Sequence, residues 1–291
     1  MKLFSEALPW YKGNLHTHTT LSDGRATPEE TFALYKAEGY SFMALTDHRK
    51  RYPGFEDKDF VVIPAGEYHL NDMATNTAYH IVGLNIASEV INTDADRPQE
   101  IIDKVVAAGG MAVVAHPAWS LMRHDELISL EHYEATEIFN GVSDAYSNRG
   151  CSADHIDSAA AKGKLPLLFA TDDTHFYDTD KFLGFIWLQT DDFSIDGIMK
   201  AIRAKQFYAS QGPRFGQITV EDGQVQVEME TPVKRISVMS NAFFAGGRVI
   251  EQSGQLITSG SYKIGGYDKW IRVEAADAEG KRCWSNFIAL K

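Results

Sequence analysis

The sequence predicts an α/β domain followed by a small all-β domain. Between about residues 13 and 210, short apolar runs alternate with longer helical patterns, as in β/α units around a parallel sheet or barrel. After residue 211, polar and apolar residues alternate in segments separated by Asp222-Gly223 and Gly246-Gly247, which is typical of antiparallel hairpins. The 291 residues also exceed one typical domain. We therefore expect domains over residues 1–211 and 212–291.

Each expected element of the first domain has a local signal. The apolar runs predict strands over residues 13–18, 41–48, 61–70, 78–85, 111–116, 135–140, 166–171, 184–190 and 207–210. A helix is expected from Pro28, with Thr27 as its N-cap and Glu29 and Glu30 in its first turn. The helices are then expected over residues 28–39, 98–109, 151–162 and 195–205.

Composition and charge limit the classes of function. Hydrophobic residues at 44% and charged residues at 23% are ordinary for a globular chain and argue against disorder. Since 28 basic residues face 40 acidic ones, the net charge is -12, and we expect no general binding of nucleic acid. A small anionic substrate stays compatible, because bound cations can reverse the local potential.

Cysteine content and the first residues indicate the compartment. Only Cys151 and Cys283 are present, so a disulfide framework has no support. Glu6 and Pro9 interrupt the stretch where a secretory signal would be apolar, and no run approaches the ~18 apolar residues of a membrane span. We expect a cytoplasmic protein with no membrane attachment.

Five short segments end apolar runs with residues that bind metal ions. They are Asn14-Leu15-His16-Thr17-His18, Leu45-Thr46-Asp47-His48, Gly66-Glu67, Val114-Ala115-His116-Pro117 and Ala170-Thr171-Asp172-Asp173-Thr174-His175, with Asp23 and His80 between them. Because β/α folds place their sites at the carboxyl ends of the strands, we expect these side chains at one rim. The set could hold two or three divalent cations, which points to hydrolysis.

These histidines could also have a purely structural role instead of binding metal. His16 and His18, two residues apart on a strand, leave the same face, but such a pair can also line a half-polar strand. Burying six imidazoles and at least three carboxylates together without metal would cost several kcal/mol for each unpaired group. The metal reading is therefore favoured. The remaining histidines are expected at surface or helix positions: His69, His124, His132 and His155.

Some acidic residues allow more than one role. Asp23, before a glycine, could simply belong to a turn. Asp47 alternates with His48, so we expect it to orient a neighbouring imidazole from behind the ligands. Two-residue spacing puts Asp173 on the side of His175 and makes it the expected ligand. Asp172 is then a supporting or substrate-facing residue.

The motifs resemble those of the PHP (polymerase and histidinol phosphatase) superfamily of metal-dependent phosphoesterases. The resemblance covers about residues 10–210 and rests on the ordered motifs His16-x-His18, Ser22-Asp23-Gly24, Thr46-Asp47-His48, Gly66-Glu67, His80, His116-Pro117 and Asp173-x-His175. The opening residues 12–18, Trp284-Ser285-Asn286 and the trailing β region are similar to a branch with a C-terminal sandwich-like domain.

The resemblance implies a distorted (β/α)7 TIM-like barrel with up to three metals. It implies that His16, His18, Glu67 and Asp173 surround one ion and that Glu67 bridges to a second. His80 and His116 would hold that second ion. Asp23, His48 and His175 would hold a third, although some members have histidine where Asp23 stands.

The expected reaction is hydrolysis of a small phosphomonoester or phosphodiester. Mixed nitrogen and oxygen ligands suit manganese, iron or zinc better than calcium or magnesium. A hydroxide shared by the metals would be the nucleophile, with Glu67, Asp173 and His175 as the catalytic residues around it.

Substrate contacts are harder to read from the sequence. Arginines that follow rim segments could bind phosphate, or could be ordinary surface residues. Asn140 could contact substrate, whereas Glu137 is expected to stay on its strand, away from the rim. Trp119 could stack on a ring or pack against the barrel. The arginine candidates are Arg25, Arg49, Arg123 and Arg149, of which Arg25 and Arg149 are preferred.

Two alternatives remain open at this point. The first is a metal-dependent hydrolase of an amide or ester, although no strand-end lysine offers the bridge usual in amidohydrolases. The second is a binding protein on the same scaffold, with the β domain as the gripping module. Phe243, Phe244, Trp270 and Trp284 of that domain are expected in its core or in its seam with the first domain.

Overall fold

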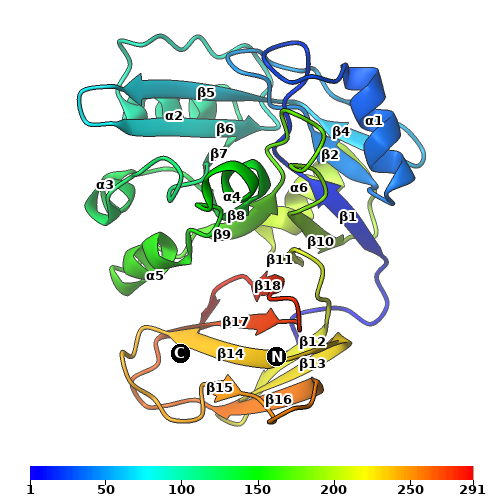
Figure 1. Ribbon diagram of the computed structural model, residues 1–291, viewed down its shortest axis with the longest axis vertical. Helices are drawn as coiled ribbons and strands as arrows, with labels where there is room; N and C mark the ends of the chain where they lie inside the picture. The colour runs from blue at the N-terminus through cyan, green and yellow to red at the C-terminus, as the bar shows by residue number, and fades with distance from the viewer. Residues whose placement is uncertain (291) are drawn as a thin grey trace.

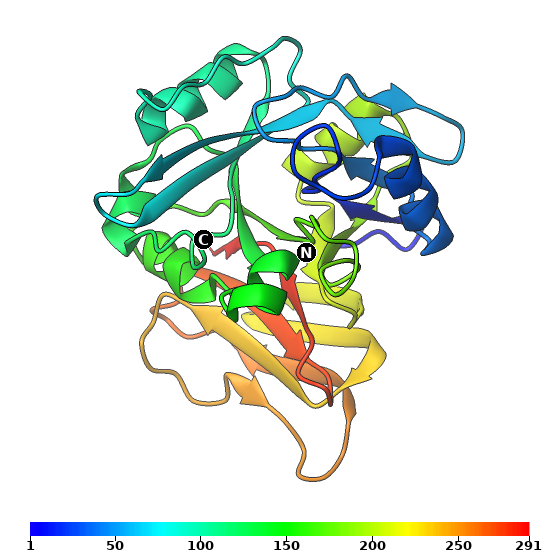
Figure 2. The ribbon, with the colours of Figure 1, turned by 45° about the horizontal axis from the view of Figure 1, so that its top comes forward.

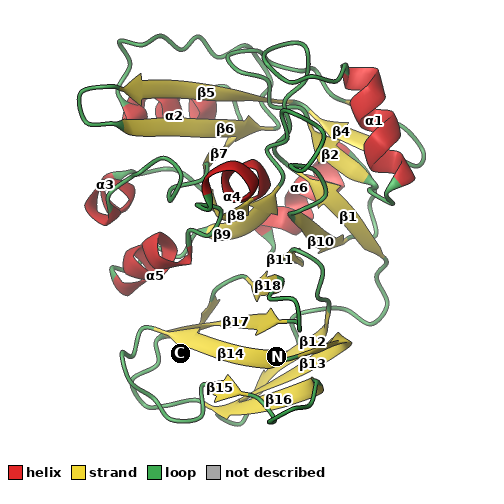
Figure 3. Ribbon diagram, viewed as in Figure 1, coloured by secondary structure: helices red, strands yellow, loops and turns green. Residues whose placement is uncertain are grey.

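A computed structural model describes residues 1–290 and shows a mixed α/β part above a β part (Figure 1). The helices all belong to the α/β part (Figure 3). They are α1 (Pro28–Ala37), α2 (Pro98–Ala107), α3 (His124–Ser129), α4 (Gly141–Ser147), α5 (Ala153–Ala161) and α6 (Ile195–Arg203). No helix within residues 1–290 has both the length and the apolar character needed to cross a membrane.

A strand overlaps each expected run up to residue 210, but the one expected over residues 13–18 spans residues 10–14, so His16 and His18 lie beyond its end. The strand at residues 55–56 was not expected. The first part contains β1 (Trp10–Asn14), β2 (Phe42–Ala44), β3 (Phe55–Glu56), β4 (Val61–Ile63), β5 (Ala65–Asp72), β6 (Thr77–Leu84), β7 (Met111–Val114), β8 (Ala135–Asn140), β9 (Leu167–Thr171), β10 (Phe185–Gln189) and β11 (Phe207–Ser210). The later strands are β12 (Phe215–Glu221), β13 (Gln224–Val233), β14 (Arg235–Ser240), β15 (Val249–Ile250), β16 (Ile257–Lys263), β17 (Trp270–Ala276), β18 (Arg282–Ser285) and β19 (Ile288–Ala289).

One 11-stranded sheet runs through both parts of the chain. Its order is β15-β14-β17-β18-β11-β10-β1-β2-β4-β3, with β19 paired to β17. The first strand, β1, therefore lies in the interior of the sheet between β10 and β2. A second sheet has the order β5-β6-β7-β8-β9, and a third, β12-β13-β16, covers the C-terminal part.

The first two sheets share a hydrophobic core. This core includes Phe42 and Ile186 from the large sheet and Val82, Val113 and Phe169 from the five-stranded one, all essentially buried. Isolated bridges, such as Thr17 with Thr174 and His48 with Glu67, join the sheets along their edges. Within residues 1–290, however, the paired strands do not form a closed barrel.

The strand directions differ from the expected all-parallel arrangement. Strands β1-β2-β4 and β7-β8-β9 are parallel, but β5, β6 and β7 pair antiparallel, as do β1, β10 and β11. Only residues 73–76 separate β5 from β6, and a parallel pair would need a crossover of a dozen or more residues. Pro64 also divides the expected strand 61–70 into β4 and β5, because proline lacks the donor that a strand interior requires.

The residues expected to mark the starts and the ends of helices α1 and α2 do so in the structure. Thr27 caps α1, and its side chain accepts from the backbone N–H of Glu30 in a complete capping box. Gly39 and Gly109, which follow α1 and α2, have φ of 77° and 78°, as helix-ending glycines do. Helices α3 and α4 were not expected. Both are short, and α4 begins directly after β8.

A buried ion-pair cluster joins the two parts. Arg272 on β17 donates from Nε and Nη2 to the carboxylate of Asp157 on α5, at 2.9 and 2.8 Å. Its Nη1 donates to Glu274 at 3.1 Å, and Trp284 Nε1 donates to the same carboxylate at 3.0 Å. The indole of Trp270 donates to the carbonyl of Ala160. The position of the predicted boundary at residue 212 stays a prediction.

Candidate metal centre

Two chain segments after β1 and β9 are fixed to each other at the rim. His18 N donates to Thr174 O at 3.0 Å, and Asp173 N donates to His16 O at 2.9 Å. Asn14, the last residue of β1, donates from Nδ2 to His16 O and to Thr17 Oγ1. The imidazoles of His16 and His18 and the carboxylate of Asp173 are therefore held together by backbone geometry.

Glu67 on β5 is the centre of the cluster. Its Oε1 lies 3.2 Å from His16 Nε2, 3.0 Å from His80 Nδ1 and 3.6 Å from His116 Nε2. Its Oε2 lies 3.4 Å from His18 Nε2 and 2.8 Å from His48 Nδ1. The side chain is 1% exposed, so its two oxygens face two different sets of imidazoles in a buried environment.

A second carboxylate, that of Asp173, lies close to His16 and His18. Asp173 Oδ1 lies 3.1 Å from the Nε2 atoms of both His16 and His18. The other carboxylate oxygen, Asp173 Oδ2, lies 3.7 Å from His116 Nε2. Asp173, and not Asp172, is thus the acidic residue of this segment that lies among the imidazoles.

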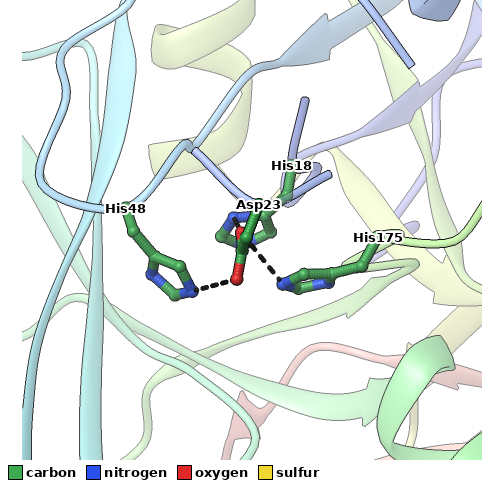
Figure 4. Close-up of side chains that lie close together, drawn as sticks. All are labelled: His18, Asp23, His48 and His175. Atoms are coloured by element: carbon green, nitrogen blue, oxygen red, sulfur yellow. Dashed lines mark ion pairs between the residues drawn. The ribbon is translucent and has the colours of Figure 1, made fainter. Parts of the chain in front are cut away.

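Asp23 lies between the imidazoles of His18, His48 and His175 at the open side of the cluster (Figure 4). Its carboxylate is 3.6 Å from His18 Nδ1, from His48 Nε2 and from His175 Nε2. The Asp23 side chain is 56% exposed, in contrast to Glu67 and Asp173. This group is therefore the one most open to solvent.

All nine side chains expected as ligands fall into groups whose donor atoms could hold an ion. The groups are His18, Asp23, His48 and His175; His16, Glu67 and His116; His16, His18 and Asp173; and His48, Glu67 and His80. Compared with the arrangement implied by the resemblance, His18 also reaches the Asp23 group and His48 also reaches Glu67. The nine residues are brought together, and their role as ligands stays a prediction.

The donor set fits divalent cations because it contains buried acceptors without hydrogen bonds. Glu137 Oε1 lies 2.7 Å from His16 Nδ1, and a carboxylate can only accept, so the His16 proton is on Nδ1. His16 Nε2 lies 3.2 Å from His18 Nε2 and close to both carboxylates. Burial works against the charged form of His16, but Asp173, Glu137 and Glu67 raise its pKa well above the usual value. Glu67 Oε2, Asp173 Oδ1 and His48 Nδ1 are buried without a hydrogen bond, although the Glu67 and His48 atoms are only 2.8 Å apart. Divalent cations between these groups would satisfy the unpaired acceptors.

Burial and opposite charge shift the pKa values here in opposing directions. Burial would raise the pKa of Glu67, but His80, His16 and His48 outweigh it and hold that pKa well below its usual value. Burial likewise works against the protonated form of His48, yet Glu67 and Asp23 raise the pKa of His48 to about 9. In the metal-free protein, protons thus take the place of cations.

Two residues of the cluster have strained backbones. His116 and Asp173 have φ of 30° and 53°, in the left-handed region that residues other than glycine seldom adopt. Strain of this kind persists only where the surrounding structure enforces it, and it concentrates at functional sites.

Glu137 is a supporting residue that the sequence did not reveal. Expected to stay away from the rim, it instead accepts from His16 Nδ1, His116 N, Asn140 Nδ2 and Thr171 Oγ1, at 2.7 to 2.8 Å. Asn140 also donates to Asp173 at 3.1 Å, so it contacts the cluster from behind. The run Glu137-x-x-Asn140 before a helix start was the available signal.

The carboxylates of Asp47 and Asp172 accept hydrogen bonds from loop residues and not from imidazoles. Asp47, expected to orient a histidine, accepts from the backbone and hydroxyl groups of Thr19 and Ser22, which fixes the loop that carries Asp23. Asp172 accepts from Tyr35 Oη and from three backbone N–H groups of residues 182–184. Burial raises the pKa of Asp172 to about 6 against these donors.

His69 was expected at a surface or helix position, but it is half-buried beside the cluster. It lies on β5, with its ring 4.6 Å from that of His48 and 5.1 Å from that of His80. Burial and its two histidine neighbours lower its pKa to about 4, so it is neutral at pH 7. Its spacing of two from Glu67 on one strand was the signal that predicts this position.

None of the four candidate arginines lines the cavity at the cluster. Arg25 lies over the ring of Phe176 at 4.8 Å, and its backbone N–H donates to His175 O. Arg49 pairs with Asp94, and Arg123 pairs with Asp125 and Glu126. Arg149 donates its backbone N–H to Ser143 O. A phosphate-binding role for Arg25 or Arg149 stays a prediction.

Some known proteins are similar to this chain in structure or in sequence. No family model matches the chain. A solved two-domain protein from Bacteroides vulgatus, described as containing a predicted PHP-like metal-dependent phosphoesterase, matches 99% of this chain and 96% of its own, with a TM-score of 0.55 and 12% identity. An uncharacterized protein of Methanocaldococcus jannaschii is 26% identical over an alignment of 145 residues, and the match covers 44% of this chain and 81% of that protein.

A partial likeness is weaker. An amidohydrolase structure from Chromobacterium violaceum matches 58% of this chain and 89% of its own, with 16% identity and a TM-score of 0.41, which is too low to establish a shared fold. The match to the Bacteroides vulgatus protein extends over both parts of the chain. The chain therefore has the fold of a two-domain PHP-like protein.

Proposed function

We propose that this protein is a metal-dependent phosphoesterase that hydrolyses a small phosphomonoester or phosphodiester. Two or three manganese, zinc or iron ions would occupy the rim of what we take to be a distorted barrel. The proposal depends chiefly on the buried cluster in which His16 Nε2 faces the carboxylates of Glu67 and Asp173, each of which has a buried oxygen without a hydrogen bond. Among the relatives, the two-domain PHP-like protein supports it.

The residues divide naturally among the ions. His16, His18 and Asp173 would bind one ion, and Glu67 would bridge to a second through its other oxygen. Its oxygens already face separate sets of imidazoles, which is what a bridging carboxylate requires. The further proposed ligands are His80 and His116 for the second ion, and Asp23, His48 and His175 for the third.

Divalent cations held there would activate water as a nucleophile and neutralise charge on the phosphoryl oxygens. The chain contributes orientation. Glu137 keeps the proton of His16 on Nδ1, and His175 Nδ1 lies 2.8 Å from Asp173 O, which leaves its Nε2 directed at Asp23. Both contacts present the other ring nitrogen, Nε2, to an ion.

The test compares matched variants of the stripped protein after manganese, zinc or iron is added back. We expect Glu67→Gln to lose more than about 100-fold in phosphoester turnover and to bind less metal by elemental analysis. The exposed Glu89→Gln is its control, and His132→Gln is the control for His16→Gln. Unchanged turnover and metal content in both cluster variants would contradict the proposal.

The same protein should be assayed on a panel of amides and carboxylic esters. Turnover of those compounds without turnover of any phosphoester would favour the alternative hydrolase. Metal binding without turnover of either class would favour a binding protein on this scaffold.

A further inference from the structure

The candidate metal centre opens into a cavity of about 360 Å³. Part of its lining comes from the candidate ligands. The rest comes from Asn71, Trp119, Val142, Ser143, Tyr146 and Phe176. The volume lies within the range of about 300 to 1,000 Å³ that is usual for small-molecule sites.

Three large aromatic side chains of this lining are exposed. Trp119 is 38% exposed, Tyr146 52% and Phe176 36%. Single exposed apolar residues are ordinary on a protein surface, but these three gather at one cavity beside the cluster. A grouped apolar patch inside a polar rim indicates a binding surface.

The aromatic side chains are held in place before any ligand arrives. Trp119, in the turn after β7, stands edge-on to the rings of His116 and His80, with centroids 4.9 and 5.7 Å away. Tyr146 on α4 packs on Phe176 at 4.7 Å, and its hydroxyl donates to Asp178 at 2.6 Å. Helix α4, in bright green, lies at the front of the molecule in Figure 2.

The cations that the cavity offers belong to the histidines of the candidate metal centre. Within residues 1–290, no lysine or arginine lines this cavity. Arg25, the nearest candidate, lies over Phe176 and lines a different hollow together with Tyr177. A second phosphate or a carboxylate on the ligand would therefore find no cationic partner outside the metal centre, whereas an uncharged ring would find three aromatic faces or edges.

On the basis of the phosphoesterase function proposed above, we infer that the substrate has a single phosphoryl group on an uncharged organic part with a flat aromatic ring. The ring packs against Trp119 and Tyr146, and Phe176 supports Tyr146. These residues determine specificity, whereas the nine-residue cluster would act on the ester.

The experiment uses esters with closely similar alcohol leaving groups. Benzyl phosphate and cyclohexylmethyl phosphate differ mainly in whether the ring is flat and aromatic, and 4-carboxybenzyl phosphate adds one anion. With the metal-loaded full chain, we expect kcat/KM for the benzyl ester to exceed that for the cyclohexylmethyl ester about tenfold. The carboxybenzyl ester should fall below the benzyl ester. Equal or reversed values would overturn the inference.

Variants connect this preference to the wall. Trp119→Leu and Tyr146→Leu keep apolar volume but remove the ring, so we expect the benzyl preference to fall to about twofold or less in each. Metal content should stay close to that of the wild type. Tyr267→Leu, at an 87% exposed position outside the cavity, is the matched control and should keep the preference. A preference retained in both cavity variants would overturn the assignment of these residues.

A binding measurement separates this inference from the proposed function. Benzylphosphonate and cyclohexylmethylphosphonate cannot be hydrolysed at their C–P bond, so calorimetric affinities for the metal-loaded protein do not depend on turnover. Tighter binding of the benzyl compound, lost in Trp119→Leu, would support the aromatic wall even if no phosphoester is hydrolysed. No difference between the two phosphonates would refute the wall while leaving phosphoester turnover intact.

Discussion

Two buried clusters of charged residues differ in whether the chain supplies hydrogen-bond partners for all their polar atoms. Around Arg272, each guanidinium nitrogen donates to a carboxylate of Asp157 or Glu274. Around Glu67, several imidazole and carboxylate atoms lie within 3.6 Å, yet buried acceptors lack donors. The first cluster is complete as a structure. The second contains buried acceptors that the chain leaves unsatisfied and that bound cations would satisfy, which is why we propose it as a metal site.

The largest expected effect comes from breaking the complete cluster. Arg272→Met leaves Asp157 and Glu274 without their buried cation, so we expect the free energy of unfolding to fall by about 3 to 5 kcal/mol. Urea denaturation measures the loss. The control is Arg235→Met, which removes an exposed pair with Glu251 and should cost no more than about 1 kcal/mol.

Metal binding should stabilise the other cluster. With free metal at about 100 times its dissociation constant, the free energy of unfolding should rise by about 2.7 kcal/mol over the chelator-treated protein. Glu67→Gln should lose much of that increment, and Arg272→Met should keep it. An increment that is equal in the wild type and in Glu67→Gln would mean that the metal binds elsewhere.

Glu137 allows a smaller, graded change. Replacing it by Gln weakens the acceptor that keeps the His16 proton on Nδ1, and we expect metal affinity to fall about 10- to 100-fold. Titration calorimetry gives the affinity, and nitrogen NMR of the His16 ring reports the tautomer. Glu134→Gln, at an exposed pair with Arg203, should change neither. If the affinity fell with an unaltered tautomer, Glu137 would act in another way.

The pH dependence of the metal-free protein further distinguishes the clusters. The pKa of His48 is raised to about 9 from about 6.5, so the folded state holds a proton that the unfolded state loses first. Its stabilisation is full below pH 6.5 and is lost as pH rises towards 9, at about 1.4 kcal/mol per pH unit. Urea denaturation of His48→Gln between pH 6.5 and 9 should show a flatter profile. An unchanged slope would contradict this origin.

Much of the cluster could be predicted because the carboxyl ends of neighbouring strands meet. His16, His48 and His116 lie beyond the ends of β1, β2 and β7, and these ends converge whatever the details of closure. Glu67 and His80, which were also expected at the rim of strand ends, lie within β5 and β6 instead. Strand direction was less accessible. The antiparallel pairing of β5 with β6 follows from the short turn between the two apolar runs. Expecting β/α units throughout overlooks this turn.

The supporting residues were harder to predict because alternation fails where they lie. The pairing of β8 with β9 shifts register between Glu137 and Phe139, so counting along the strand does not give the direction of Glu137. Asp173 lies beyond the end of β9 with a left-handed backbone. Its place beside His16 therefore comes from the turn and not from the strand alternation that selected it.

The interior position of β1 in the large sheet has a consequence for synthesis. Residues 10–14 leave the ribosome long before their partners at 186–189 in β10 exist, and β11 in turn waits for β18 near residue 284. The α/β part therefore cannot assemble from the first half of the nascent chain alone. Contacts this distant in sequence slow folding, so β1 should depend on chaperones or on the nearby β2 to avoid aggregation until β10 arrives.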